Sequence, residues 1–177
     1  PMHPDSVLTL FRRCGAMLEG HFRLASGLHS LGYLQCALVL QHPDHAATLG
    51  VALAERVRDL HVTTVLSPAL GGIVIGHEVA RALGARAVFT ERQDGPLALR
   101  RGFTIAPGER VLVVEDVITT GGSALEACEA VNHARGEVLG VLGLVDREEG
   151  GRAALENAGL KTIVLYTASD LRKCVEA

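Results

Sequence analysis

The stretch RVLVVEDVITTGGSALEACEAV, residues 110 to 131, constrains the fold more than any other part of the sequence. It opens with a continuous apolar run from Val111 to Val114, which is typical of a strand buried on both faces. Two carboxylates, Glu115 and Asp116, come next, followed by a loop of hydroxyls and glycines and then by apolar residues at helical spacing. The pattern predicts a strand, an anion-binding loop and a helix in immediate succession, with Ser123 as the helix cap.

The chemistry of this succession favours a phosphate ligand. A helix N-terminus offers unpaired N–H groups and the positive end of the helix dipole. Gly121 and Gly122 let the main chain approach a ligand closely. The hydroxyls of Thr119, Thr120 and Ser123 add hydrogen-bond donors. Because carboxylates repel phosphate, we expect the acidic pair to face ribose hydroxyls or a Mg²⁺ ion shared with the ligand.

Two other phosphate-binding motifs are absent from this stretch. A Walker A loop requires GxxxxGK[ST], and residues 110 to 131 contain no lysine. The dinucleotide fingerprint GxGxxG is missing as well. An ordinary strand–turn–helix with capping residues remains the alternative without a function.

Composition narrows the classes of protein that fit. The 177 residues predict a single domain, residues 1–177, and the net charge of −3 gives no electrostatic basis for binding nucleic acid or membranes. Aromatic residues make up only 3% with no Trp, which argues against a base-stacking platform. No signal peptide or membrane-length apolar run is present, and the cysteines form no CxxC pair. We therefore expect a cytoplasmic protein in a reducing compartment.

Strand and helix patterns alternate along the rest of the chain. Ser6 and Asp44 each begin a predicted helix, the first with Val7, Leu10, Phe11, Cys14 and Leu18 on one face. A final predicted helix is capped by Ser169. The alternation predicts an α/β fold with a parallel sheet and helices on both faces. The apolar runs that predict further strands are 62–66, 86–90, 138–145 and 162–166.

Two short motifs outside the central stretch are less specific. SPALGG, residues 67 to 72, follows a predicted strand and precedes a helix, so it fits either a second anion site or a plain tight turn. His42 and His45 form an HxxH pair that is typical of metal ligands. Because the pair straddles Pro43 and a helix start, we expect solvated histidines instead.

EDVITTGGS resembles the phosphoribosyl diphosphate (PRPP) signature of type I phosphoribosyltransferases. The resemblance implies their fold, a central parallel sheet flanked by helices with a small N-terminal hood. It implies that Glu115 and Asp116 hold the ribose hydroxyls as catalytic residues and that Thr119 to Ser123 clasp the 5′-phosphate. The PRPP-binding set that it implies is Glu115, Asp116, Val117, Ile118, Thr119, Thr120, Gly121, Gly122, Ser123, Leu70, Gly71 and Arg92.

Two further segments resemble orotate phosphoribosyltransferases. Residues 22 to 33 are similar to their FxLxSGxxSxxYxx segment, with the tyrosine shifted by one position to Tyr33. The resemblance makes residues 1 to about 40 a hood over the base and about 44–177 the core. Asp146–Arg147 ends a predicted strand on the ligand side, where a guanidinium can grip a planar carboxylate through two hydrogen bonds. The orotate-binding residues implied are Thr119, Arg147, Ser26 and Tyr33.

Two loops depart from the family pattern. Residues 68 to 72 resemble its diphosphate loop, but Gly71 stands where many orotate enzymes carry lysine, so backbone N–H groups would have to bind the diphosphate. Residues 91 to 103 resemble its mobile catalytic loop in a short-loop, bacterial-like form. Arg92 matches the first arginine of that loop, whereas Gln93 replaces a lysine and no histidine follows. Arg100 or Arg101 would supply the missing charge.

The resemblance implies an enzyme that converts orotate and PRPP into orotidine 5′-monophosphate and diphosphate in pyrimidine biosynthesis. It implies Mg²⁺ as cofactor, carried by PRPP with Asp116 as its ligand on the protein, and a homodimer. Two alternatives remain open. A purine-specific phosphoribosyltransferase would share the PRPP loop without needing Arg147 or the hood. A PRPP-sensing regulator that binds nucleic acid would require a basic surface.

Overall fold

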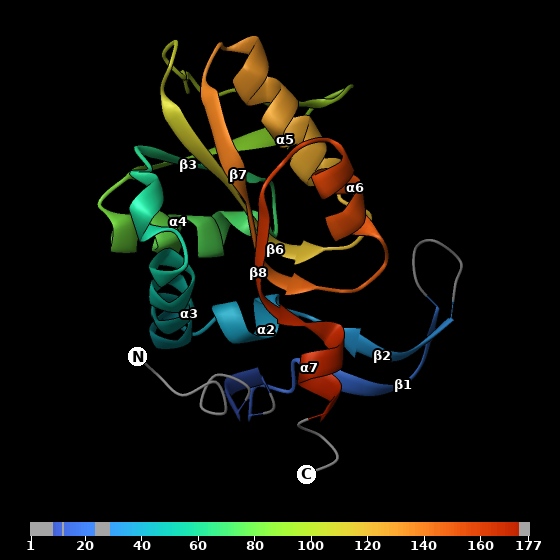
Figure 1. Cartoon of the computed structure of the whole chain (residues 1–177). Helices are drawn as coiled ribbons and strands as arrows, with labels where there is room; N and C mark the ends of the chain where they lie inside the picture. Colours follow the sequence, from blue (N-terminus) through green and yellow to red (C-terminus); the bar gives the residue numbers. More distant parts are fainter. Residues whose placement is uncertain (1–8, 12, 24–28, 174–177) are drawn as a thin grey trace.

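A computed structural model describes residues 9–11, 13–23 and 29–173 of the chain. Six strands form the central sheet in the order β5-β4-β3-β6-β7-β8 (Figure 1). Their bounds are β3 Thr64–Pro68, β4 Arg86–Arg92, β5 Leu97–Leu99, β6 Arg110–Ile118, β7 Glu137–Asp146 and β8 Thr162–Thr167. All neighbouring pairs are parallel except β4 with β5. The predicted α/β fold with a parallel sheet is confirmed, and the antiparallel edge strand β5 was not predicted.

Helices cover both faces of this sheet (Figure 1). Side chains of α3 and α4 pack with one set of strand residues, and side chains of α5 and α6 pack with the other set. In β6 the apolar residues alternate, so that Leu112 and Val114 face the α3 and α4 layer, whereas Val111 and Val113 face the α5 layer. The helix bounds are α2 Ala37–Leu40, α3 Pro43–Glu55, α4 Gly72–Leu83, α5 Gly122–His133, α6 Gly151–Asn157 and α7 Ala168–Lys173, with a 3₁₀ turn at Arg58–Leu60.

The strand order creates a switch point between β3 and β6. From β3 the chain crosses to β4 on one side, and it later returns to β6 on the other side of β3. The parallel pairing of β3 with β6 ends at Leu66 and Val113, whereas β6 continues to pair with β7 as far as Ile118. Open parallel sheets bind ligands at such a point, outside the carboxyl ends of the strands.

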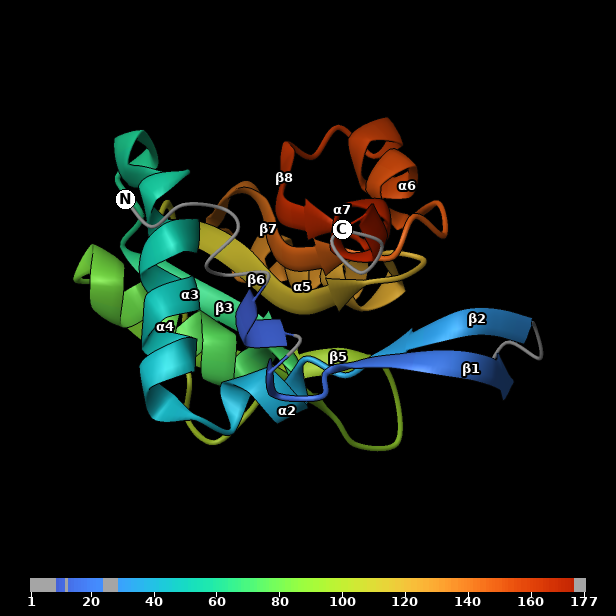
Figure 2. The ribbon, with the colours of Figure 1, turned by 90° about the horizontal axis from the view of Figure 1, so that it is seen from below.

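The N-terminal part forms a separate antiparallel pair of strands, β1 Met17–Arg23 and β2 His29–Leu34. Figure 2 shows this β1–β2 hairpin reaching away from the six-stranded sheet. Leu18 lies in β1, so its predicted place in a first helix is wrong, although residues 9 to 11 and 13 are helical. Ser6 and Val7 lie outside the described residues.

Several boundaries differ from those expected. Strand β6 runs on through Glu115 and Asp116, so the acidic pair belongs to the strand itself. Helix α5 has Gly121 as its N-cap, without a side-chain cap, so the prediction of Ser123 as the cap is wrong. Ser169 lies inside α7, and its hydroxyl donates to Glu148. Among the described residues no helix has the length and apolar character needed to span a bilayer.

Candidate active site

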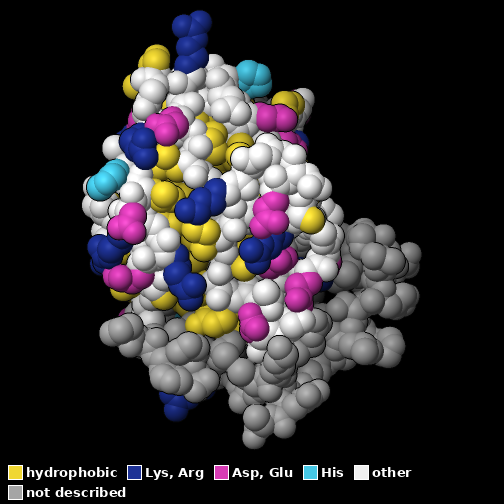
Figure 3. Space-filling view, in the orientation of Figure 1, with side chains coloured by type: hydrophobic (Ala, Val, Ile, Leu, Met, Phe, Trp, Pro, Cys, Tyr) yellow, Lys and Arg dark blue, Asp and Glu magenta, His cyan; other side chains and the backbone are white. Residues whose placement is uncertain are grey.

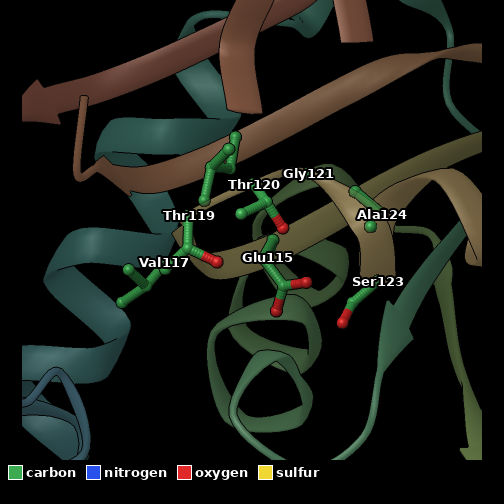
Figure 4. Close-up of a pocket in the computed structure, with 9 residues that line it drawn as sticks. Glu115, Val117, Thr119, Thr120, Gly121, Ser123 and Ala124 are labelled. Atoms are coloured by element: carbon green, nitrogen blue, oxygen red, sulfur yellow. The ribbon is translucent and has the colours of Figure 1, made fainter. Parts of the chain in front are cut away.

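A shallow pocket with a volume of about 50 Å³ opens to solvent where β6 ends and α5 begins. In Figure 4 the hydroxyl groups of Thr119, Thr120 and Ser123 lie around the carboxyl group of Glu115. The pocket therefore combines hydroxyl donors with the first backbone N–H groups of a helix of twelve residues. Its lining residues are Glu115, Val117, Ile118, Thr119, Thr120, Gly121, Gly122, Ser123 and Ala124.

Gly121 gives this pocket its backbone shape. Its φ of 83° lies in the left-handed region, which residues with a side chain avoid. A Cβ atom here would also approach the carbonyl oxygen of Gly151 to 3.0 Å. Because Gly121 is the N-cap, this conformation turns the chain from the strand into α5 and leaves Ser123 exposed.

Glu115 is a buried carboxyl group and Asp116 a half-buried one, and both have raised pKa values. Only 8% of Glu115 is exposed, and its burial, together with the neighbouring charge of Asp116, raises its pKa to about 9. Burial also raises the pKa of Asp116. Near neutral pH the pair therefore holds a proton on Glu115.

The two carboxyl groups border the N-terminal end of α4. A Cβ atom on Gly71 would lie 2.5 Å from Asp116 Oδ2, and one on Gly72 would lie 3.3 Å from Glu115 Oε1. The turn after β3 thus packs directly against the acidic pair of β6. Leu70 in this turn is 83% exposed, and Asp116 is not among the residues that line the phosphate-sized pocket.

The acidic pair has the donor chemistry of a divalent-cation site. No ion pair joins either carboxyl group to an Arg, Lys or His side chain within the described part of the chain. A cation that shares these oxygens would offset the unfavourable burial that raises their pKa values. The residues present therefore fit Mg²⁺, with Asp116 against Gly71 of the turn after β3.

Arg147 lies beside the phosphate loop. Its backbone N–H donates to the carbonyl oxygen of Ile118 at 2.9 Å, and Gly151 N–H donates to Thr119 in the same way at 2.9 Å. The Arg147 guanidinium is 16% exposed and forms an ion pair with Glu149 at 3.0 Å. Asp146 is buried, and its carboxylate accepts the backbone N–H of Glu148. The predicted carboxylate-binding arginine is thus tied to the same backbone that forms the pocket.

Arg92 is not in the pocket lining. Its Nη2 donates to Glu126 Oε1 of α5 at 2.8 Å, and Glu126 Oε2 accepts the backbone N–H of Leu97 at 2.8 Å. Sequence reasoning missed Glu126, because a lone glutamate on an amphipathic helix carries no signal. The β4–β5 hairpin (residues 86 to 99) is thereby fastened to α5.

The other two arginines of the predicted catalytic loop are also paired. Arg101 bonds both oxygens of Glu91, at 2.8 and 2.9 Å, and Arg100 lies 3.8 Å from the same carboxylate. The guanidinium carbon of Arg101 also sits 5.7 Å from the centre of the Phe89 ring. Their predicted role in catalysis stays a prediction.

The proposed orotate-binding residues of the hood are only partly placed. Ser26 lies outside the described residues. The backbone of Tyr33 belongs to β2 and pairs with Leu18 of β1. The roles of Ser26 and Tyr33 therefore remain predictions that follow from the resemblance alone.

Comparisons with known proteins agree with this geometry. Residues 38–158 match the model of the phosphoribosyl transferase domain. The chain is 53% identical over 167 residues to the orotate phosphoribosyltransferase of Pelotomaculum thermopropionicum, covering 94% of this chain and 86% of that relative. It is 52% identical over 168 residues to the enzyme of the same name from Desulforamulus reducens, covering 95% and 86%.

Solved structures of orotate phosphoribosyltransferases are also similar to this chain. Mycobacterium tuberculosis orotate phosphoribosyltransferase in complex with inorganic phosphate superposes with a TM-score of 0.79 at 30% identity, covering 95% of this chain and 97% of that one. The complex of the same enzyme with PRPP gives 0.78 at 29% identity, covering 95% and 98%. Site geometry, domain match and relatives at about half identity agree, and the chain belongs to the orotate phosphoribosyltransferase family of type I phosphoribosyltransferases.

Proposed function

We infer that this chain transfers the 5-phosphoribosyl group from PRPP to orotate, giving orotidine 5′-monophosphate and diphosphate. One observation carries the proposal: the backbone N–H of Arg147 donates to Ile118, so the predicted carboxylate-binding arginine is joined to the same strand end that bears the acidic pair and the pocket. The names of the two relatives described above support it.

The pocket at the start of α5 would hold the 5′-phosphate. Its ligands would be the N–H groups of the first helical turn and the hydroxyls of Thr119, Thr120 and Ser123. Glu115 lines the same pocket, and as a protonated group near neutral pH it donates a hydrogen bond where an ionised carboxylate would repel phosphate. The raised pKa thus removes the conflict between acid and phosphate.

The turn of residues 69 to 72 would face the diphosphate. Because glycine occupies positions 71 and 72, only backbone N–H groups are available in this half of the turn. Asp116, which lies against Gly71 of this turn, would then face the diphosphate and the ribose next to it. When Mg²⁺ is bound there, with Asp116 as its protein ligand, it neutralises charge that develops on the departing diphosphate.

The reaction replaces the C1–oxygen bond to diphosphate by a bond from C1 to a ring nitrogen of orotate, and the proton of that nitrogen is released to solvent. The electron pair of the broken bond leaves with the diphosphate, and positive charge develops on the ribose. Such a step requires positioning and electrostatic stabilisation more than proton transfer. Glu115 and Asp116 would hold the ribose hydroxyls and so fix the attack geometry.

Orotate would bind on the side of Arg147. A guanidinium can donate two parallel hydrogen bonds to a carboxylate, so orotate would exchange places with Glu149. Thr119 lies next to Ile118, whose carbonyl oxygen accepts from Arg147, so it can contact both substrates. Arg92, Arg100 and Arg101 would approach the reacting centre only after their glutamate partners were exchanged for phosphate oxygens.

The proposal includes a homodimer in the cytoplasm. Exposed apolar side chains support a subunit interface near the diphosphate turn: Leu70, and Val51 and Val74 on α3 and α4. A nucleic-acid-binding regulator has no such support. On the face drawn in Figure 3, Lys and Arg side chains alternate with Asp and Glu, so no basic stripe crosses the described part of it.

Loss of orotate absorbance in the presence of PRPP and Mg²⁺ tests the proposal. Wild type should consume orotate, and Arg147→Ala should raise the KM for orotate by about 10- to 100-fold because a charge-assisted pair is lost. Arg152→Ala is the matched control, since Arg152 pairs with Glu156 on the surface of α6. If the protein consumed adenine or hypoxanthine instead of orotate, the PRPP site would be supported and the proposed specificity for orotate would be wrong.

A further inference from the structure

Three metal-ligating side chains meet on the α3 side of the molecule, away from the pocket at the start of α5. One ligand atom from each of Cys14, His42 and His45 lies within 4.8 Å of the other two. Cys14 Sγ is 3.4 Å from His45 Nδ1, and the rings of His42 and His45 are 5.0 Å apart at 61°. His42 is exposed, and the other two are half-buried.

Local structure explains how two histidines come together. His42 is the N-cap of α3 and Pro43 its first residue, so His45 lies in the first turn, three residues after His42 and on the same side of the helix. The solvated histidines predicted from the HxxH pattern are therefore only partly confirmed, because His45 is in contact with a cysteine.

Cys14 belongs to a different segment, the one just before β1. Phe11 is fully buried and stacks edge-on against Tyr166 of β8, and Ala16 N–H donates to the carbonyl oxygen of Phe11. These contacts fix the chain on either side of Cys14. The cluster therefore joins the segment just before β1 to the start of α3.

The spacing suits one tetrahedral ion. With metal–sulfur and metal–nitrogen bonds of about 2.3 and 2.0–2.1 Å, a thiolate and an imidazole on the same zinc ion lie about 3.6 Å apart. The observed separation of 3.4 Å between Sγ and Nδ1 is close to this value. The third ligand atom needs to move by only about 1 Å, which an exposed histidine can do by a side-chain rotation.

We propose that Cys14, His42 and His45 form a Zn²⁺ site, with water or another exogenous ligand in the fourth position. Thiolate and imidazole donors select Zn²⁺ over the oxygen-binding Mg²⁺, so this site is chemically distinct from the acidic pair at the pocket. Bound zinc clamps the segment that leads into the β1–β2 hairpin onto α3. The site does not depend on the proposed transferase activity.

Titration calorimetry with Zn²⁺, in excess Mg²⁺ to occupy the carboxylates, tests the site. Wild type should bind one equivalent, and His42→Ala, Cys14→Ser and His45→Ala should each weaken this binding by roughly 100-fold or more. His42 is exposed, so His42→Ala keeps the test valid if the other two variants fold poorly. His133→Ala removes an exposed histidine of α5 and should bind like wild type.

Cobalt gives a second readout that reports the ligands directly. Co²⁺ in the site should show a thiolate charge-transfer band in the near ultraviolet and intense tetrahedral visible bands. Cys14→Ser should lose the first, and His133→Ala should keep both. Zinc binding that is equal in wild type and His42→Ala, or a cobalt complex without the thiolate band, would show that Cys14 and His45 form only a hydrogen bond.

Discussion

The phosphate pocket and the β4–β5 hairpin both contain residues that the family resemblance assigns to PRPP, but they are built in opposite ways. The pocket consists of backbone groups, hydroxyls and the buried Glu115, whose pKa is raised by burial and by the adjacent Asp116. In the hairpin and the two residues that follow it, the arginines of the predicted catalytic loop are exposed, and each forms an ion pair with a glutamate. The groups of the pocket therefore have fixed positions before substrate binds. The arginines, in contrast, must exchange their glutamate partners for substrate before they can take part in the reaction.

This difference separates pre-organisation from adaptability. Buried groups in fixed positions stabilise developing charge without reorganisation. Exposed ion pairs contribute about 0–1 kcal/mol each, so a substrate phosphate can replace the glutamate at little cost. Variants in the two regions should consequently differ in both size and kind of effect.

The largest loss is expected at the acidic pair. Asp116→Asn removes the carboxylate that lies against Gly71 at the start of α4, and kcat/KM should fall by about 100- to 1,000-fold. The orotate absorbance assay measures it. Asp59→Asn, on the surface 3₁₀ turn, is the control and should match wild type. A loss of less than about threefold in Asp116→Asn would show that the pair has only a structural role.

A pair of glycine variants compares the two backbones. Gly121→Ala forces a side chain into a left-handed conformation 3.0 Å from a carbonyl oxygen, so unfolding free energy should fall by at least about 1–2 kcal/mol. Gly95→Ala, in the hairpin turn, meets no atom within 4 Å and should change stability little. Denaturant titration measures both. Equal stability of the two variants would contradict a rigid pocket.

The raised pKa of Glu115 predicts a pH dependence of stability. The folded state keeps this proton up to about pH 9, whereas an unfolded glutamate loses it near its ordinary value of 4.5. The contribution to stability is therefore full below pH 4.5 and is lost as the pH rises towards 9, by at most about 1.4 kcal/mol per pH unit. Relative to Glu115→Gln, wild type should lose Tm between pH 5 and 9 in buffer without Mg²⁺ or PRPP. If Tm changed with pH equally in wild type and in Glu115→Gln, the result would contradict a raised pKa of the buried Glu115.

The smallest effects are expected in the hairpin. Glu126→Gln weakens the link between Arg92 and α5, so hydrogen exchange should rise at residues 93 to 97 while kcat/KM stays within about threefold. Arg92→Ala should lower kcat/KM by about tenfold or more if the guanidinium reaches the diphosphate. Equal effects of both variants would make Arg92 an anchor of the hairpin and remove it from catalysis.

The pocket was more predictable than the hairpin because its signal is local. Val111 to Ser123 contains strand, loop and helix start in one continuous piece, so neighbouring residues in sequence are neighbours in space. Its cap was missed because Gly121 adopts a left-handed conformation that a Ser-first capping rule does not foresee. Strand β5 was missed because three residues beside a Gly-Pro pair carry too little periodicity.

Contacts between distant segments were the least predictable. Glu126 acquires its role only because β4 and β5 happen to lie over α5. The approach of Gly71 to Asp116 likewise depends on the pairing of β3 with β6. Cys14 and His45 meet across two segments that no pattern in the sequence connects.

The switch point also governs how this enzyme regains activity after unfolding. The diphosphate turn and the acidic pair meet only when β3 has paired with β6, and the whole of α4, β4 and β5 lies between them in the chain. Long-range parallel pairing is slow compared with helix formation. Recovery of turnover should therefore lag behind recovery of the far-ultraviolet circular dichroism. The return of activity would then report when β3 has paired with β6.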